Sequence, residues 1–338
     1  MILRTFTAAI AATTLGLGMT SSASADDKKI LTVYTYDAFA ADWGAGPKVE
    51  KAFEANCNCD LQFVAVDSSV GILSRLKLEG KDTAADVVLG LDTNLTAEAA
   101  ATGLFAKSNV SSQSFKLPIS WNDEFFVPFD YGYFAFVYNS EKLSNAPASL
   151  DQLINENPDL KIIIQDPRSS TTGLGFMLWM QKVYGDQSVE AWQKLSPKIV
   201  TVTKGWSEAY GLFKDGEADM VLSYTTSPAY HIIAEENKQY KAAIFDEGHY
   251  TQVEVAAQLS SSKEPELAQD FMSFIATKDF QNQIPTGNWM YPAIDLGDEL
   301  PSTFEELPKP EKALLFSPED AQNNRQAWID NWLGAIDR

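Results

Sequence analysis

The feature that most constrains the fold is an alternation of strand-like and helical segments that begins close to residue 30. The strand-like segments are β-branched and aromatic, and the helical ones are amphipathic. Parallel strands need crossover connections, which are usually helices, so this order favours an α/β fold with doubly wound, mostly parallel sheets. In chain order the segments are strand 30–36 (ILTVYTY), a helix opened by GAGP at 44–47 and ending near 54, strand 60–66 (DLQFVAV), helix 70–79 and strand 85–91 (ADVVLGL).

The alternation starts again in a second half of the chain, with strands expected at 161–165, 199–203 and 219–224. Two long extended stretches, 124–139 and 243–255, lie on either side of this second half. We expect both to cross between two lobes, because paired crossings make a hinge with a ligand cleft between the lobes. The predicted division places 26–130 and 246–298 in lobe 1 and 131–245 in lobe 2, with C-terminal helices in 299–338 packing on lobe 2.

Residues 1–25 have the pattern of a secretory signal peptide. Arg4 supplies the positive start, an apolar small-residue run follows, and Ala23-Ser24-Ala25 is a small-x-small cleavage site. We therefore expect a periplasmic protein whose mature chain starts after Ala25. The formal net charge of −20 argues against nucleic acid and anionic lipid as partners. The same charge suits a monomer that attracts small cations.

The chain has two cysteines, Cys57 and Cys59, in the sequence CNC. An even count in an oxidising compartment predicts a disulfide, provided that the turn brings the two Cα atoms within about 6.8 Å. The reduced pair remains the alternative at this point. No metal site is expected, because no second Cys or His pair lies nearby.

The turns that follow the strands are the candidate site, because ligands of open α/β sheets bind beyond the carboxyl ends of strands. These turns repeat two chemistries, aromatic rings and small hydroxyls at helix starts. Taken singly, each ring could fill a local core and each hydroxyl could be an ordinary helix N-cap. The predicted ligand-binding residues are Tyr36, Trp43, Asp67, Ser68, Ser170, Thr171, Trp206, Tyr224, Thr225, Thr226, Ser227, Tyr230 and Trp289.

Five motifs carry a resemblance to a known family. They are LTVYTYDAFAADWGAGP, FVPFDYGYFAFVYN, TVTKGWSEAYGLF, VLSYTTSPAYH and IPTGNWMYP. With them the chain resembles the periplasmic thiamine-binding proteins of bacterial ABC importers. The resemblance implies a two-lobed periplasmic-binding-protein fold of type II, with the ligand between the lobes. It also implies that most of the rings and hydroxyls above contact the ligand.

The resemblance has one departure. After the second strand, members of this family often carry two acids and a glycine, whereas here Asp67 is followed by Ser68 and Ser69. Either Asp67 reaches the ligand, or Ser68 replaces a carboxylate with a hydroxyl.

A thiamine ligand would explain why rings and carboxylates gather in YTYDAFAADWG at 34–44. Its thiazolium is a flat permanent cation, and aromatic faces attract such a cation by roughly 0.5–2 kcal/mol each. The resemblance implies a binding protein without enzymatic activity or cofactor. It would take up thiamine, thiamine monophosphate and thiamine diphosphate and deliver them to an inner-membrane ABC permease. The alternatives are a thiaminase-like enzyme and a binder of another organic cation such as a polyamine.

Overall fold

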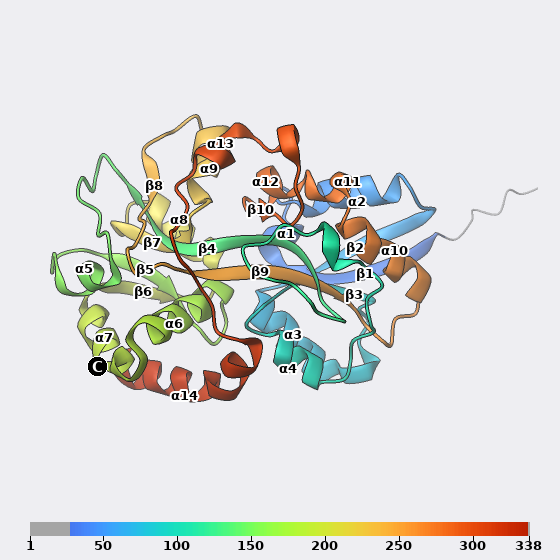
Figure 1. Ribbon diagram of the computed structural model, residues 1–338, viewed down its shortest axis with the longest axis horizontal. Helices are drawn as coiled ribbons and strands as arrows, with labels where there is room; N and C mark the ends of the chain where they lie inside the picture. The colour runs from blue at the N-terminus through green and yellow to red at the C-terminus, as the bar shows by residue number, and fades with distance from the viewer. Residues whose placement is uncertain (1–27, 337–338) are drawn as a thin grey trace, which may run out of the picture.

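The strands of the computed structural model, which describes residues 28–336, form one path of sheet that runs through two lobes (Figure 1). The signal-peptide prediction lies outside these residues. Three short strands attach at the sides of the path: β8 (Tyr240–Ala242) and β10 (Tyr291–Pro292) pair with β4, and β11 (Ala313–Leu314) pairs with β9. Along the path the order is β2 (Cys59–Val66), β1 (Lys29–Tyr36), β3 (Val87–Asp92), β9 (His249–Gln258), β4 (Val127–Asn139), β7 (Met220–Tyr224), β5 (Ile162–Gln165) and β6 (Ile199–Thr203).

Strands β4 and β9 pass from one lobe to the other (Figure 1). The first part of β4 pairs antiparallel with β9, and the second part pairs antiparallel with β7. Pro128, which interrupts the sequence pattern, lies within β4 beside a register shift, the kind of irregular position at which a strand tolerates proline. The return strand starts later than the extended run at 243 suggests, because a turn ending at Gly248 with φ +98° precedes His249.

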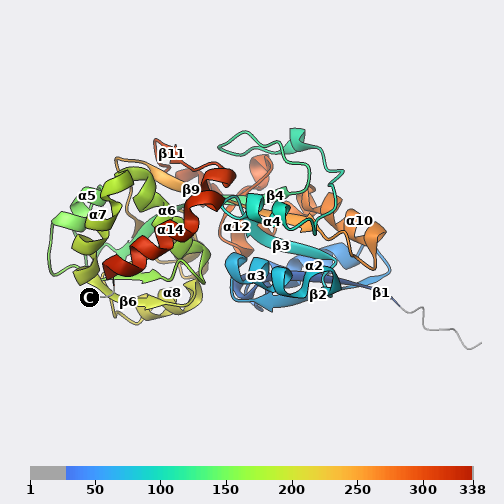
Figure 2. The same ribbon diagram turned by 90° about the horizontal axis from the view of Figure 1, so that it is seen from below.

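Helices cover both faces of the sheet in each lobe (Figures 1 and 2). In the first lobe they are α1 (Asp37–Ala40), α2 (Gly46–Glu54), α3 (Ser69–Glu79), α4 (Thr96–Ala101), α10 (Pro265–Ile275), α11 (Lys278–Gln281) and α12 (Ile284–Gly287). In the second lobe they are α5 (Leu150–Asn155), α6 (Thr171–Tyr184), α7 (Ser188–Leu195), α8 (Trp206–Lys214) and α9 (Ser227–Ala234). The C-terminal segment adds α13 (Ser302–Glu306) and α14 (Pro318–Ile336).

Helix α14 packs against α6 and α7 of the second lobe and also against α4 of the first. Its apolar face buries Ile329 and Trp332, and the Trp332 ring meets Trp192 of α7 edge to face at 6.4 Å. Contact with both lobes was not expected for this helix. The residue boundaries assigned to the lobes from the sequence stay a prediction.

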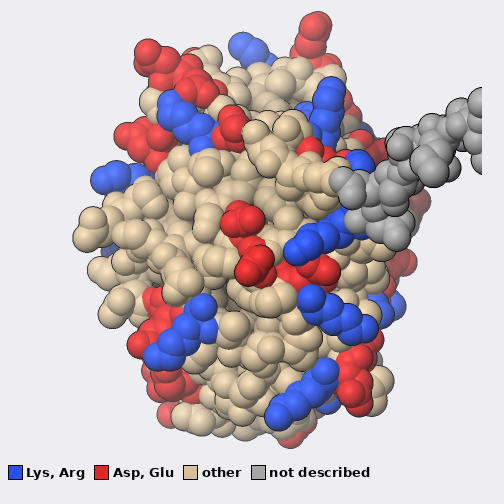
Figure 3. Space-filling view, turned by 90° about the vertical axis from the view of Figure 1, so that its right-hand side faces the viewer, with Lys and Arg blue, Asp and Glu red and all other residues tan. Residues whose placement is uncertain are grey.

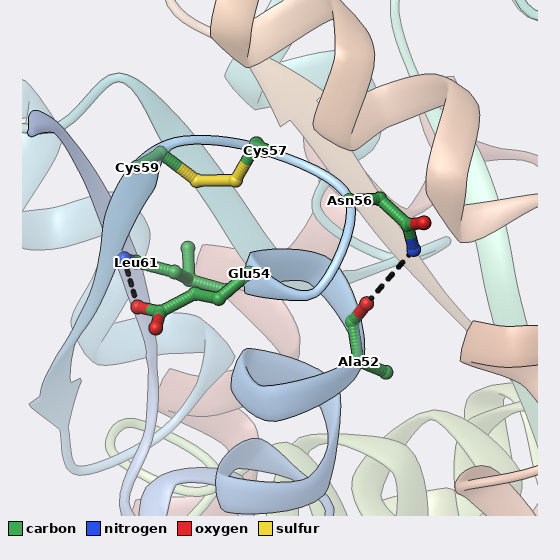
Figure 4. Close-up of a disulfide and its surroundings, with 6 residues drawn as sticks. All are labelled: Ala52, Glu54, Asn56, Cys57, Cys59 and Leu61. Atoms are coloured by element: carbon green, nitrogen blue, oxygen red, sulfur yellow. Dashed lines mark hydrogen bonds between the residues drawn. A yellow bond between two sulfur atoms is a disulfide. The ribbon is translucent and has the colours of Figure 1, made fainter.

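Cys57 and Cys59 form a disulfide in the turn between α2 and β2, with their Cα atoms 5.3 Å apart (Figure 4). The same turn is held by the Glu54 carboxylate, which accepts the N–H of Leu61 at 2.9 Å. This turn precedes β2, so it lies at the opposite end of the strand from Asp67. Figure 3 shows a face of the first lobe on which Lys and Arg side chains are scattered among acids rather than gathered in a basic patch. Within residues 28–336, no helix has the length and apolar character needed to cross a membrane.

Candidate functional site

A cavity of about 520 Å³ opens between the lobes at the carboxyl ends of β1, β2 and β7. This volume lies in the range that small-molecule sites usually have. Turns from both lobes contribute side chains to it, as the strand-end rule predicts. Of the residues predicted from the sequence, those that line the cavity are Tyr36, Trp43, Asp67, Ser68, Ser170, Thr171, Trp206, Tyr224, Ser227, Tyr230 and Trp289.

Thr225 and Thr226, which the sequence predicts in the site, do not line the cavity. Both side chains are fully buried in the turn between β7 and α9. The N–H of Thr225 donates to the carbonyl of Tyr133, and the hydroxyl of Thr226 faces the sulfur of Met290. The turn therefore uses these two residues for packing, and only its flanking residues, Tyr224 and Ser227, face the opening.

The cavity also contains residues that the sequence reasoning did not assign to it. Tyr210 and Lys214 lie one and two turns after Trp206 on α8, and this helical spacing could have revealed them. Glu254 lies inside a strand, where a rule based on turns gives no signal. The other unassigned lining residues are Asp37, Ala38, Thr172, Ser207, Gly211, Ala234, Gly287, Asn288 and Met290.

Aromatic rings form much of the cavity wall. Trp206 stacks on Tyr210 with ring centroids 4.9 Å apart, and its indole N–H donates to Ser223 Oγ at 2.8 Å. Tyr230 and Trp289 meet edge to face at 5.2 Å. Trp289 is held at φ +57°, a conformation that a bulky residue adopts only where the surroundings enforce it. Packing of these rings on one another therefore holds this part of the cavity wall.

The ring of Tyr36 lies directly over Gly90 of β3, which has φ +107°. A Cβ at Gly90 would come within 2.4 Å of the Tyr36 ring, so only glycine allows the ring to lie there. This close approach places the Tyr36 hydroxyl at the cavity, where it donates to the Glu254 carboxylate at 2.7 Å.

The small hydroxyls lie at helix starts and also border the cavity, and one of them, Ser170, caps its helix. Ser170 is the N-cap of α6 and accepts from the N–H of Gly173, while Thr171 begins the helix. Ser227 begins α9 and accepts from the N–H of Tyr224 at 3.2 Å. The capping interpretation and the ligand interpretation are therefore compatible, because a hydroxyl at a helix start can do both.

Three contacts close the lobes on one another at the edge of the cavity. Asp67 forms an ion pair with Lys204, and the Ser68 hydroxyl donates to the carbonyl of Ser169. The N–H of Ser69 donates to Thr171 Oγ1 at 3.3 Å. The turn that departs from the family pattern thus serves interlobe contact, and both Asp67 and Ser68 remain at the cavity wall.

The charge around the cavity favours a cationic ligand. Among the lining residues Asp37, Asp67 and Glu254 are acids, while the cation Lys214 is already paired with Glu235 at 2.6 Å. Burial raises the pKa of Asp37, and the N–H of Ala38 opposes this shift. No cluster of His, Cys, Asp and Glu within the described part of the chain is arranged to hold a metal ion.

Comparison with known proteins identifies the class. Residues 34–282 match the family described as bacterial extracellular solute-binding protein, and the chain belongs to that family. The chain is 60% identical over 311 residues to the thiamine-binding periplasmic protein of Escherichia coli (strain K12), covering 92% of this chain and 94% of that one.

Two solved structures share the fold. A periplasmic thiamin binding protein superposes with a TM-score of 0.91 at 59% identity, covering 93% of this chain and 98% of the other. The periplasmic binding protein AfuA from Actinobacillus pleuropneumoniae gives 0.76 at 18% identity, covering 92% and 99%, and so bears on the fold alone. The predicted type II, two-lobed periplasmic-binding-protein fold and the resemblance to thiamine-binding periplasmic proteins are confirmed.

Proposed function

We propose that this chain captures thiamine in the interlobe cavity and delivers it to an inner-membrane ABC permease. The observation that carries the proposal is a ring-lined, acid-rich cavity in a chain that is 60% identical to a thiamine-binding periplasmic protein. Rings such as Trp206 and Tyr230 offer faces to the flat thiazolium cation, and the acids add Coulomb attraction. The chain acts in the periplasm as a monomer after cleavage of residues 1–25.

The same cavity accepts the mono- and diphosphate esters of thiamine. The starts of α6 and α9 border it with Ser170, Thr171 and Ser227, and helix N-termini favour anions. Lys214 lies at the wall as well, with its ammonium 5.3 Å from the centre of the Tyr230 ring. An ester phosphate beside these groups would gain charge-assisted hydrogen bonds of about 1.5–3 kcal/mol each.

The protein acts as a binder and not as a thiaminase-like enzyme. Both of its cysteines are joined in the disulfide at the start of β2, remote along that strand from Asp67. Neither cysteine is therefore available in the cavity as a thiol nucleophile. No cofactor takes part, and the rings and acids of the cavity are sufficient to bind a flat cation.

The test combines native mass spectrometry with calorimetry on the purified mature protein. We expect thiamine to co-purify or to bind on titration with a 1:1 stoichiometry, and spermidine and choline to bind at least about a hundredfold more weakly, a difference of about 2.8 kcal/mol. Prolonged incubation should return thiamine intact. Tighter binding of spermidine or choline, or cleavage of thiamine, would reject the proposal.

A further inference from the structure

Three acidic side chains lie in one row across adjacent strands, and one of them, Glu254, lines the cavity. In the strand register Asp92 of β3 is opposite Glu254 of β9, which is opposite Asp130 of β4. Asp92 and Asp130 are 0% exposed and Glu254 is 5% exposed. Like charges directly opposite on neighbouring strands repel, and burying an ionised carboxylate without a counter-ion is costly. The negative charge of these three carboxyl groups therefore has to be offset by hydrogen-bond donors, positive groups or protons.

Asp92 has its own compensation. Its carboxylate accepts the N–H of Asn94 at 2.7 Å, and the guanidinium of Arg325 on α14 attracts its negative charge. Burial nevertheless raises the pKa of Asp92 to about 6, against these two influences. Asp92 is thus an additional acid that faces Glu254 and disfavours a second charge there.

Asp130 and Glu254 receive only neutral donors. The Asn288 amide donates to Asp130 Oδ2 at 2.5 Å and lies 3.3 Å from Glu254 Oε2. Glu254 also accepts from the hydroxyl of Tyr36 at 2.7 Å and from the amide of Gln252 at 2.9 Å. Asp130 Oδ1 is buried without a donor among the described residues. Because one amide nitrogen, Nδ2 of Asn288, lies within reach of both Asp130 Oδ2 and Glu254 Oε2, the two carboxyl groups are close neighbours, and two negative charges there would repel each other. A proton on one of the two carboxyl groups removes this repulsion.

The chemistry of the surrounding strands supports this proton. Burial raises the pKa of Glu254 to about 7, and burial together with the charge of Glu254 raises the pKa of Asp130 well above its usual range. Tyr224 at the end of β7 faces the pair, and burial and the charges of Glu254 and Asp130 raise its pKa too. Among the described residues, the groups that shift the pKa values of Asp130 and Glu254 are acids, phenols and amides, not cations.

We propose that Asp130 and Glu254 share one proton in the ligand-free cleft and release it to solvent when a cationic ligand enters, so that Glu254 becomes the counter-charge of that ligand. One proton leaves for each positive charge that arrives, so the summed charge of the two carboxyl groups and the ligand is unchanged. The inference rests on the proposed function, since it takes thiamine as the cation. A ligand without a positive charge gains nothing from this exchange.

The experiment is calorimetric titration of the full mature protein with thiamine in buffers of different ionisation enthalpy. Because burial raises the pKa of Glu254, we expect more proton release on binding near pH 6.5 than near pH 8. The dissociation constant should rise with falling pH, approaching tenfold per unit well below pH 7. The dissociation constant rises at low pH because the proton competes with the ligand for the same carboxylate.

Two variants and a matched control make the assignment specific. Glu254→Gln should abolish proton release and flatten the pH profile, whereas Glu141→Gln, an exposed change of the same kind outside the cavity, should behave as wild type. Asp130→Asn removes the partner without touching the cavity wall, so the midpoint of proton release should move to lower pH. This variant also tests the inference if Glu254→Gln does not fold.

The outcomes separate the inference from the proposed function. Wild-type protein that binds thiamine without proton release at either pH overturns the shared proton and leaves the function intact. Equal proton release in wild type and Glu254→Gln assigns the proton to another group and also overturns it. Absence of thiamine binding by the wild type rejects the proposed function itself.

Discussion

Replacing Trp206 with alanine tests how much one ring contributes to ligand binding. Trp206 begins α8, lines the cavity, stacks on Tyr210 at 4.9 Å and donates to Ser223. Its indole supplies an aromatic face to the cavity wall. The change removes this face while leaving the cap of α8, which is the backbone of Gly205, in place.

The expected loss has two parts. Removing the cation–π contact costs roughly 0.5–2 kcal/mol. Losing about 50 Å² of apolar contact with the ligand costs about 1.2 kcal/mol at 25 cal/mol per Å². The sum, about 1.7–3.2 kcal/mol, corresponds to a rise of about 15- to 200-fold in the dissociation constant. Stability should fall as well, by about 1–3 kcal/mol for the stacking and the hydrogen bond.

The assay is calorimetric titration with thiamine, paired with urea unfolding. Trp328→Ala is the matched control, because Trp328 packs on Phe316 at 4.9 Å and is outside the cavity lining. Trp206→Phe, which keeps a ring but loses the N–H, should fall between wild type and Trp206→Ala. If Trp206→Ala and Trp328→Ala bind thiamine with the same affinity, Trp206 does not face the ligand and the reasoning fails.

Three further outcomes are expected. Replacing Cys57 and Cys59 together with serine should leave thiamine affinity within a few-fold, because their turn lies at the far end of β2; a larger loss in titration would place that turn in the site. In competition titrations the phosphate esters should bind about as tightly as thiamine, and Ser170→Ala should weaken the diphosphate more than thiamine; a preference for thiamine above about a hundredfold (2.8 kcal/mol) would reduce the hydroxyls to plain caps. Burial lowers the pKa of His249 from 6.5 to about 4, so the unfolded chain takes up the proton first and stability is lost as the pH falls through this window, by up to about 3 kcal/mol. Urea unfolding of wild type and His249→Gln at both ends of the window should show a difference that shrinks at low pH, and a constant difference would contradict the assignment.

The elements could be predicted because their patterns are local. Within a few residues, Pro47 indicates the start of helix α2, and the β-branched run of β5 indicates a strand. The short helix α1 could not be predicted, because its four residues lack a side-chain cap and depend on burial of Phe39 against the lobe.

The cavity was predictable where it is built from turns and not where it is built from strand interiors. Trp43 and Trp206 follow strands, so a topological rule finds them. Glu254 and Asp130 lie within strands and meet only through a register that joins distant parts of the chain. No local pattern states that register. Hydroxyl-rich turns look alike in sequence whether they face a ligand or the core, so the sequence does not separate Thr225 and Thr226, which are outside the cavity lining, from Ser227, which is in it.

The antiparallel pairing of β3 with β9 has a consequence for the order of folding. Val88 of β3 lies opposite Ala257 of β9, so β3 can pair with β9 only after the chain of the second lobe has been synthesised. Contacts between such distant residues form late, because a long loop must be closed first. Every residue of β3 is buried in the finished protein. A fragment that ends before His249 would leave β3 as an open apolar edge, which favours pairing with other chains. Expression of residues 26–248 should therefore give aggregates, detected by light scattering. A soluble monomer would show that the apolar edge of β3 is buried in another way.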